Sequence, residues 1–430
     1  MNLAIFTIVY LASFFLASAD MYIASGCVLL AFVFFKTIRD VKKLLRGRSS
    51  VCTLSIVFTL SYLGGVSLSA MKLSHLQTSW SYITWICFYL MYIVFQIVLR
   101  LLNSHTYHHQ INSTKSIKLS HSRLYICIVV LTLISSMCFC VEAYLLGFIP
   151  FFTSGVPHAY STFHITGVHY FTVSCVLVPA LCIVWIYTPK PAVSVSSNLL
   201  IAICFILSLG IPILCVSRFQ FVFAVGLMLV TWALMRRESM GVVLPLVSGV
   251  GVVAVYIILT VARAHSVDYL NSIFEMKYEL PIFVTQPYMY IANNFDNFDC
   301  LVRQLPEFAH GIRMLYPIFV FTGLKFKCPQ LVSLPIYVNK EELTTLTIGY
   351  DAYYDFGVVG IAAFALLLGV ASWIFENRIR LSRNAIGYVL YGQFFIYIAL
   401  AFFTTWFSNP TTWFYFGITT IVFLICSKGR

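Results

Sequence analysis

Charged residues are scarce in this chain. Only 10% of its 430 residues are Asp, Glu, Lys or Arg, whereas 60% are apolar and 17% are aromatic. A water-soluble protein has roughly a quarter of its residues charged, because those side chains cover its surface. The composition therefore excludes a set of soluble domains, and the mean hydropathy of +0.90 indicates an integral membrane protein.

Several other signals are missing as well. We expect the N-terminal apolar run to be retained as a helix and not removed as a signal peptide. No internal repeat is visible, which disfavours transporter folds built from duplicated halves. The net charge is +12, but the basic residues stand in short gaps between apolar runs and not on a polar domain. Nucleic-acid binding is therefore not expected.

About twelve stretches are apolar and long enough to cross a bilayer as helices. They are residues 3–19, 21–35, 51–70, 80–99, 124–146, 166–187, 198–216, 219–235, 241–262, 352–375, 385–407 and 411–426. Only Asp20 separates the first two, which predicts a tight helical hairpin. We expect an all-α polytopic membrane protein of about twelve transmembrane helices.

Lys and Arg are concentrated in alternate gaps between these stretches. The gaps at 36–50, 100–123, 188–197, 236–240, 376–384 and 427–430 hold 18 of the 27 basic residues and only three acidic ones. The rest of the chain holds nine basic and twelve acidic residues. Because cytoplasmic loops are rich in Lys and Arg, both termini are predicted to lie in the cytoplasm.

The opposite face then carries two loops. In chain order the predicted parts are N-terminal helices (1–146), a first outer loop (147–165), central helices (166–262), a large outer loop (263–350) and C-terminal helices (351–430). A structureless loop as long as 263–350 is uncommon, so we expect it to form a helical cap of short amphipathic pieces. Its two cysteines, Cys300 and Cys328, could form one disulfide in an oxidising compartment.

Arg218 is the most informative residue. It interrupts a stretch, 198–235, that holds no other charge and is long enough for two membrane crossings. The arginine is therefore expected at a hairpin apex, where it would face an aqueous cavity or an anion. Arg263 ends the next predicted span on the same face, and two guanidinium groups there could clamp a diphosphate. A helix-end cation that reaches the lipid headgroups is the alternative for both.

The outer face also offers candidate acids, bases and binding groups, which include His158, His164, Arg313, Asp351 and Asp355. A carboxylate or imidazole could take the proton of a sugar hydroxyl, whereas each of these residues also suits a structural role. No Cys pair on this face has metal-ligand spacing, and no Asp-x-Asp pair occurs there. We therefore expect neither a metal nor another cofactor.

Four residues at the entrance to the predicted span 352–375 share one helical face. They are Tyr350, Asp351, Tyr354 and Asp355. Such a face can line a sugar site, with rings that stack and carboxylates that accept hydroxyl hydrogens. It is equally typical of an aromatic belt at a membrane surface.

Several motifs recur in a recognisable order. They are Gly147-Phe-Ile-Pro150, Ser217-Arg218-Phe219, Tyr290-Ile-Ala-Asn-Asn-Phe-Asp-Asn-Phe298, Thr344-Thr345 and Tyr350-Asp-Ala-Tyr-Tyr-Asp-Phe-Gly-Val-Val-Gly360. With the topology, they resemble the oligosaccharide repeat-unit polymerases, the Wzy-type O-antigen or capsule polymerases of bacteria, over roughly residues 145–375. One departure lies in the first outer loop, where many relatives carry an arginine and this chain has His158 and His164.

The resemblance implies an enzyme of GT-C-like architecture in the bacterial inner membrane. It would transfer the growing glycan from undecaprenyl diphosphate to an incoming lipid-linked repeat unit at the periplasmic face, without nucleotide sugar or metal. A flippase and a chain-length regulator would be its partners. The catalytic candidates are Arg218, Arg263, Asp351 and Asp355, and the substrate-binding candidates are Tyr350, Tyr354, His158, His164 and Arg313.

Two alternatives stay open. An O-antigen ligase has similar architecture and chemistry but uses the lipid A core as acceptor. A flippase of lipid-linked oligosaccharides is a transporter, and it would be expected to have short outer loops. The large loop at 263–350 counts against the flippase.

The charge distribution predicts the outcome of reporter fusions. Fusions at residue 300 should report the periplasm, and fusions at 45, 112 and 428 should report the cytoplasm, because the basic gaps stay on the cytoplasmic side. Paired phosphatase and fluorescent-protein fusions measure this directly. A cytoplasmic signal at residue 300 would overturn the orientation and every outer-face candidate with it.

Overall fold

A computed structural model describes residues 3–45, 53–106, 119–153, 162–188, 195–236, 267–332, 334–380 and 384–427. All named elements within these ranges are helical. Eight described helices are long and apolar enough to cross a membrane, and three shorter apolar helices accompany them. The chain is therefore an all-α, multi-pass membrane protein. The predicted span 241–262 lies outside the described residues.

The chain folds into two compact units. The first combines Met1–Ile111, His265–Asn377 and Tyr397–Trp413. The second combines Asn112–Ala264, Arg378–Ile396 and Phe414–Arg430. Each unit is thus assembled from segments far apart in the sequence, whereas the five predicted parts follow chain order.

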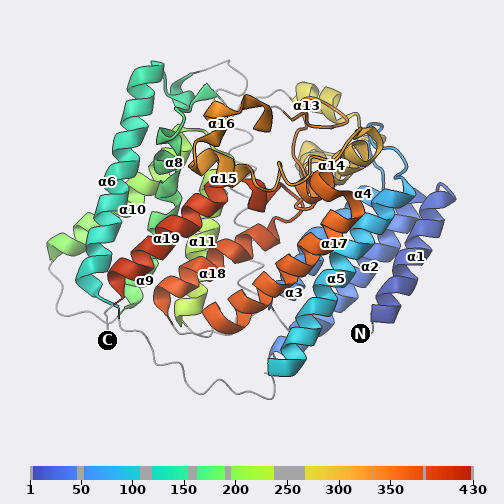
Figure 1. Cartoon of the computed structure of the whole chain (residues 1–430), viewed down its shortest axis with the longest axis horizontal. Coiled ribbons are helices and arrows are strands. Elements are labelled where there is room, and N and C mark those ends of the chain that lie inside the picture. The colour runs from blue at the N-terminus through green and yellow to red at the C-terminus, as the bar shows by residue number, and fades with distance from the viewer. Residues whose placement is uncertain are drawn as a thin grey trace. The chain divides into compact units, whose positions relative to one another are not determined.

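The first unit begins with a helical hairpin of α1 (Leu3–Ser18) and α2 (Tyr22–Leu45), which lie side by side in Figure 1. Asp20 has a left-handed backbone (φ +58°) and reverses the chain between them. The hydroxyls of Ser13 and Ser25 hydrogen bond across the pair, with 2.8 Å between the two oxygens. The hairpin predicted at Asp20 is confirmed.

Two further membrane helices complete this part of the unit. The first, Thr53–Ala70, consists of α3 (Thr53–Phe58), a π-helical turn (Thr59–Leu63) and α4 (Gly64–Ala70). The second, α5 (Tyr82–Thr106), packs along α17 (Tyr350–Ile374). Figure 1 shows α5 and α17 as neighbouring rods.

A kink divides α17 near its start. Gly357 has φ +61°, a backbone that L-residues rarely adopt, and a Cβ atom there would lie 2.8 Å from the ring of Phe308. The kink separates the first turns, which carry Asp351 and Tyr354, from the long apolar remainder. This geometry lets the first turns meet the cap while the rest of the helix follows α5.

Residues 267–346 form the cap of the first unit. It contains α13 (Val267–Phe274), α14 (Ile282–Gln304), α15 (Tyr316–Phe321), α16 (Leu324–Lys327) and a 3₁₀ turn, Pro329–Leu331. Its helical character was predicted and is confirmed for the described residues, but α14 spans 23 residues and is not a short piece. Cys300 and Cys328 are both free thiols.

The buried face of α14 is polar, and Asp296 anchors it. The Asp296 carboxylate accepts hydrogen bonds from Ser69 Oγ (3.0 Å), Gln77 Nε2 (2.6 Å), Trp80 Nε1 (2.8 Å) and the Lys72 ammonium. Asp296 and Lys72 are 4% and 3% exposed. Burial raises the pKa of Asp296 and lowers that of Lys72, while the attraction between them opposes both shifts.

One turn further along α14, Asp299 makes a second attachment. Its Oδ1 atom accepts hydrogen bonds from the Ser81 backbone N–H (2.8 Å) and the Thr84 hydroxyl (2.5 Å), both at the start of α5. Its Oδ2 atom accepts from Arg303 Nε at 2.6 Å. Two buried carboxylates thus fix α14 to the ends of α4 and α5.

The second unit is built mainly from six helical pieces. They are α6 (His121–Leu146), α8 (Val168–Val173), a 3₁₀ turn (Ser174–Leu177), α9 (Val178–Tyr187), α10 (Val195–Leu214) and α11 (Arg218–Arg236). Within it, α9 packs against α11, and α6 packs against α8 and α10.

Two C-terminal helices, α18 (Ala385–Ala399) and α19 (Pro410–Cys426), contribute residues to both units. The predicted span 385–407 is wrong at its end, because α18 stops at Ala399. Trp406 Nε1 donates to the carbonyl of Leu400 at 2.9 Å, which satisfies a backbone acceptor left by the helix end. Asn409 caps α19 by accepting the Thr411 N–H at 2.9 Å.

The Asp296 anchor predicts an asymmetric effect of mutation. Asp296→Asn should destabilise the protein by about 3–5 kcal/mol, because it leaves the Lys72 ammonium buried without its carboxylate. Lys72→Met should cost less, since three neutral donors still bind Asp296. Thermal unfolding in detergent, followed with a thiol-reactive dye, measures both.

Glu275→Gln is the matched control. Its partner is Lys340 at 2.7 Å, but the Glu275 side chain is 44% exposed, so the change should cost less than about 1 kcal/mol. Equal losses of stability from Asp296→Asn and Lys72→Met would contradict this explanation. They would show that the unpaired Lys72 ammonium is not what makes Asp296→Asn more destabilising.

Candidate functional site

The first unit contains a cavity of about 390 Å³ beside the start of α17. Its polar lining consists of Arg313, Asp351, Thr405, Ser408 and Asn409. Its remaining lining consists of Ile312, Tyr316, Leu331, Val332, Leu334, Ile336, Leu346 and Pro410. A space of this volume, lined by two opposite charges and several apolar residues, suits an amphiphilic ligand.

Arg313 supplies the positive charge of this cavity. Its Nη2 atom donates to the carbonyl of Pro335 at 3.1 Å, and its guanidinium carbon lies 4.7 Å from the centre of the Tyr354 ring. Its Nε atom lies 3.5 Å from Asp351 Oδ1. At that distance the two side chains form an ion pair, but the separation is too long for a good hydrogen bond. Among the described residues, Arg313 Nε has no hydrogen-bond partner.

Asp351 supplies the negative charge. It is 5% exposed, and its Oδ2 atom accepts a hydrogen bond from the Ser408 hydroxyl. Its Oδ1 atom, which faces Arg313, accepts no hydrogen bond from any described residue. One oxygen of the carboxylate is therefore fixed, and the other retains its capacity to accept a proton or a hydrogen bond.

Asp355 holds the loop that carries Arg313, and Tyr350 holds the chain at Tyr337. The Asp355 carboxylate accepts the backbone N–H groups of Arg313 (3.1 Å) and Met314 (2.8 Å). The Tyr350 hydroxyl donates to the Tyr337 carbonyl at 3.0 Å and accepts the Tyr337 N–H at 2.8 Å. Neither side chain is in the lining of the cavity. Both position the groups that are.

The four residues predicted to share a face of α17 therefore contact one segment of the cap, residues 313–337. Asp351 and Tyr354 contact the Arg313 side chain, Asp355 binds backbone at Arg313, and Tyr350 binds backbone at Tyr337. Each was a site candidate, but only Asp351 lines the cavity. The sequence pattern indicated the shared face but not this division of tasks.

The asparagine-rich motif of α14 fixes the chain that leads into α17. Asn297 Nδ2 donates to the carbonyls of Leu343 (2.7 Å) and Thr345 (2.9 Å). Asn293 Oδ1 accepts from Asn339 Nδ2 at 2.7 Å. The motifs at 290–298, 344–345 and 350–360 thus meet in one unit, although up to about 50 residues separate them in the sequence.

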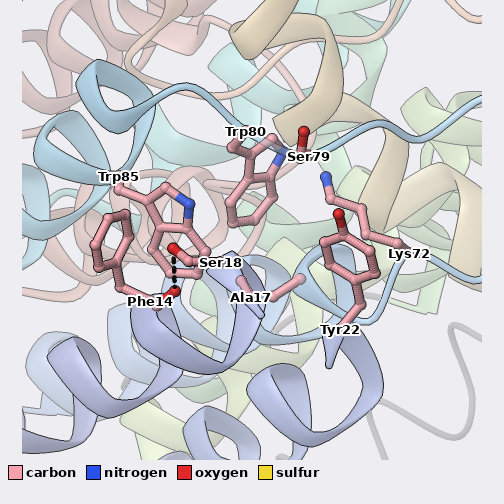
Figure 2. Close-up of a pocket in the computed structure, with 9 residues that line it drawn as sticks. Phe14, Ala17, Ser18, Tyr22, Lys72, Ser79, Trp80 and Trp85 are labelled. Atoms are coloured by element: carbon pink, nitrogen blue, oxygen red, sulfur yellow. Dashed lines mark hydrogen bonds between the residues drawn. The ribbon is translucent and has the colours of Figure 1, made fainter. Parts of the chain in front are cut away.

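A second cavity, of about 50 Å³, lies beside the Asp296 anchor (Figure 2). Figure 2 shows Trp80 and Trp85 on one side of it and Lys72 next to Tyr22 on the other. The Lys72 ammonium lies 4.0 Å from the centre of the Trp80 ring. This space holds at most about four water molecules, and its one cation is already paired, so it belongs to the anchor.

In the second unit, Arg218 is the first residue of α11. The preceding helix α10 ends at Leu214, and the Ser217 N–H donates to the Pro212 carbonyl at 2.9 Å, so the predicted hairpin apex is confirmed. A cation at a helix N-terminus meets the positive end of the helix dipole, which is unfavourable unless an anion lies nearby. The position therefore suits an arginine that binds an anion.

The sequence analysis missed a buried carboxylate in the second unit. Glu142 of α6 is fully buried and accepts the Ile165 N–H at 2.9 Å; its Oε1 atom lies 3.1 Å from His169 Nδ1. His164, a predicted binding residue, is exposed, and its ring centre lies 6.3 Å from that of His169. Glu142 and Asp355 are the only acidic residues inside the predicted spans, and that rarity is a functional signal in itself.

The remaining candidates are distributed as follows. Arg263 and His158 lie outside the described residues. Over the described ranges, no group of three or more His, Cys, Asp or Glu side chains could hold a metal ion.

Comparisons with protein-family models, with curated proteins and with solved structures found no match to this chain.

Proposed function

We propose that the protein is a membrane glycosyltransferase, an O-antigen or capsular polysaccharide polymerase. It would transfer the growing glycan from undecaprenyl diphosphate to an incoming lipid-linked repeat unit. The observation that carries the proposal is the cavity that Arg313 and Asp351 line together with several apolar residues. In it, Arg313 Nε lies 3.5 Å from Asp351 Oδ1. The reaction needs a cation for the leaving diphosphate and an acceptor for a hydroxyl proton, in a space that takes an amphiphile.

The proposed step uses both charged groups. The acceptor hydroxyl oxygen attacks the anomeric carbon of the donor sugar, and the bond from that carbon to the diphosphate oxygen breaks. The diphosphate leaves with the bonding electron pair, and the hydroxyl proton passes to Asp351 Oδ1. Arg313 is fixed in advance by Pro335, Tyr354 and the Asp355-bound backbone, so it can stabilise the charge that develops on the diphosphate.

Other predicted residues keep proposed roles. Arg218 is proposed to bind the diphosphate of a lipid-linked substrate, and its place at the start of α11 supports this role. Arg263 would assist it, and His158 and His164 would contact the glycan. The reaction is proposed for the periplasmic face of the bacterial inner membrane, with both termini in the cytoplasm. A flippase would supply the lipid-linked units, and a chain-length regulator would end the polymer.

The anchored cap supports an enzyme over a flippase. A transporter has to open a path for its cargo, whereas two buried carboxylates fasten α14 to the membrane helices of its own unit. An O-antigen ligase would use the same chemistry with a different acceptor. Only the product distinguishes the ligase from the polymerase.

A deletion strain provides that distinction. Without the protein, the lipid A core should carry at most one repeat unit, because flipping and ligation continue while polymerisation stops. The banding pattern of the lipopolysaccharide on a gel, with and without a plasmid copy of the gene, is the measurement. Complete absence of the repeat unit would favour a flippase or a ligase and would contradict the proposal.

Substitutions test the cavity in a complemented strain and with purified protein. Arg313→Ala should slow polymerisation by about a hundredfold, as expected when a preorganised charge donor is lost. Arg313→Lys should restore only part of the rate, because an ammonium is a point charge without the planar fork. Arg218→Ala and Arg218→Lys should follow the same order. Glycan ladder length at matched membrane abundance reports each variant.

Arg236→Ala is the matched control, because Arg236 stands at the opposite end of α11 from Arg218. It should leave the ladder unchanged. Asp351→Asn should lower the rate by roughly 10²–10⁴, because the amide cannot take the proton. A full-length ladder from both Arg313→Ala and Asp351→Asn would remove the cavity from the proposal and leave Arg218 as its centre.

A further inference from the structure

One segment of the cap supplies none of the reacting groups proposed above. Residues 315–332, here called the tip segment, leave the cavity wall at Tyr316 and return to it at Leu331. Gly323, with φ +73°, turns the chain between α15 and α16. These helices have six and four residues, so neither can cross a bilayer, and the segment is not among the candidate membrane spans.

The tip segment exposes large apolar side chains. Leu315, Ile318 and Phe321 follow one another at intervals of three residues and are 46%, 52% and 50% exposed. That interval places them along one side of a helix. Leu324 and Phe326 of α16 are 40% and 69% exposed. Large apolar side chains exposed together in one short segment are unfavourable in water and mark a site of interaction with a partner or a membrane.

The charge of the segment has a single sign. From Phe308 to Asn339 the chain holds Arg313, Lys325 and Lys327 and no acidic residue. Lys325 and Lys327 flank the most exposed ring of the segment, Phe326, and Lys325 Nζ lies 4.9 Å from the centre of that ring. An aromatic ring between two lysines is typical of a segment that lies in a membrane interface, with the ring among acyl chains and the ammonium groups at phosphates.

We propose that the tip segment is inserted into one leaflet of the bilayer that the helices of this chain cross. Its exposed apolar side chains contact acyl chains, and Lys325 and Lys327 bind the phosphates of anionic phospholipids. The occupant of this surface is a lipid leaflet and not a second protein, because the lysines complement phosphate charge and the surface includes no acidic partner for them.

The proposal has a consequence for the cavity. Tyr316 and Leu331, at the two ends of the tip segment, both line it. A lipid-linked ligand can therefore keep its tail in the leaflet while its phosphate reaches Arg313. This consequence rests on the proposed function, whereas the insertion of the segment does not.

Photocrosslinking in nanodiscs tests the insertion. The full chain is reconstituted in a mixture of phosphatidylethanolamine and phosphatidylglycerol, with a photoreactive benzoylphenylalanine in place of Phe326. Matched probes replace Ile206 of α10, which is 68% exposed on a candidate span, and Glu341, which is exposed and polar. Phospholipid adducts from position 326 should equal those from 206 and exceed those from 341 about tenfold, as the transfer of an apolar ring from water to lipid predicts.

The charges are tested on the same probe. Lys325→Glu and Lys327→Glu should each lower the ratio of phosphatidylglycerol to phosphatidylethanolamine adducts about fivefold, because each lysine loses its attraction to an anionic lipid. A yield at 326 no higher than at 341, or a crosslink to a second copy of the chain, would overturn the proposal. No glycan substrate is present, so these results are independent of polymerase activity and a failure of one proposal leaves the other standing.

Discussion

A carboxylate buried as deeply as Asp296 has to be surrounded by donors, because neither water nor lipid can compensate its charge there. The end of α4 and the loop that follows it supply those donors. This requirement fixes α14, and α14 in turn fixes the loop at 339–345 through Asn293 and Asn297. The first turns of α17 follow directly from that loop. The position of Asp351 in the cavity therefore depends, step by step, on one satisfied carboxylate.

Preorganisation is the second consequence of this arrangement. The guanidinium of Arg313 is held by a carbonyl, by an aromatic ring and by a backbone turn that Asp355 binds. These contacts fix the direction of the charge before any ligand arrives, which is what makes such a charge effective. The kink at Gly357 contributes by turning the start of α17 toward the cap. Residues that do not line the cavity thus determine the geometry of Arg313 and Asp351, the two charged residues that do line it.

Much of the membrane architecture could be predicted from composition. Long apolar runs have to form helices in a bilayer, because their backbone groups have no other partners there. The breaks at Asp20 and Arg218 were predicted correctly for the same reason, since a polar residue within an apolar run marks a turn. The polar buried face of α14 could not be predicted, because its asparagines and Asp296 resemble a surface until their partners from distant segments are known. The orientation of the chain in the membrane stays a prediction.

The site shows the same limit in more detail. Spacing alone grouped Tyr350, Asp351, Tyr354 and Asp355, since a helix brings such positions to one side. It could not separate the carboxylate that lines the cavity from the one that binds backbone N–H groups. That difference arises from residues 312–314 and 405–409, which meet α17 only in the folded chain. The apolar composition of 400–407 likewise concealed the end of α18.

The separation of Lys72 from Asp296 also has a consequence for synthesis. The two residues are 224 positions apart in the chain. At the usual rate of translation, roughly 5–20 residues per second, the lysine emerges on the order of 10–45 seconds before its carboxylate exists. During that interval the ammonium has no acidic partner from α14, so water or other polar groups have to solvate it. The cap can therefore bind the early helices of the first unit only late in synthesis, after those helices have been made.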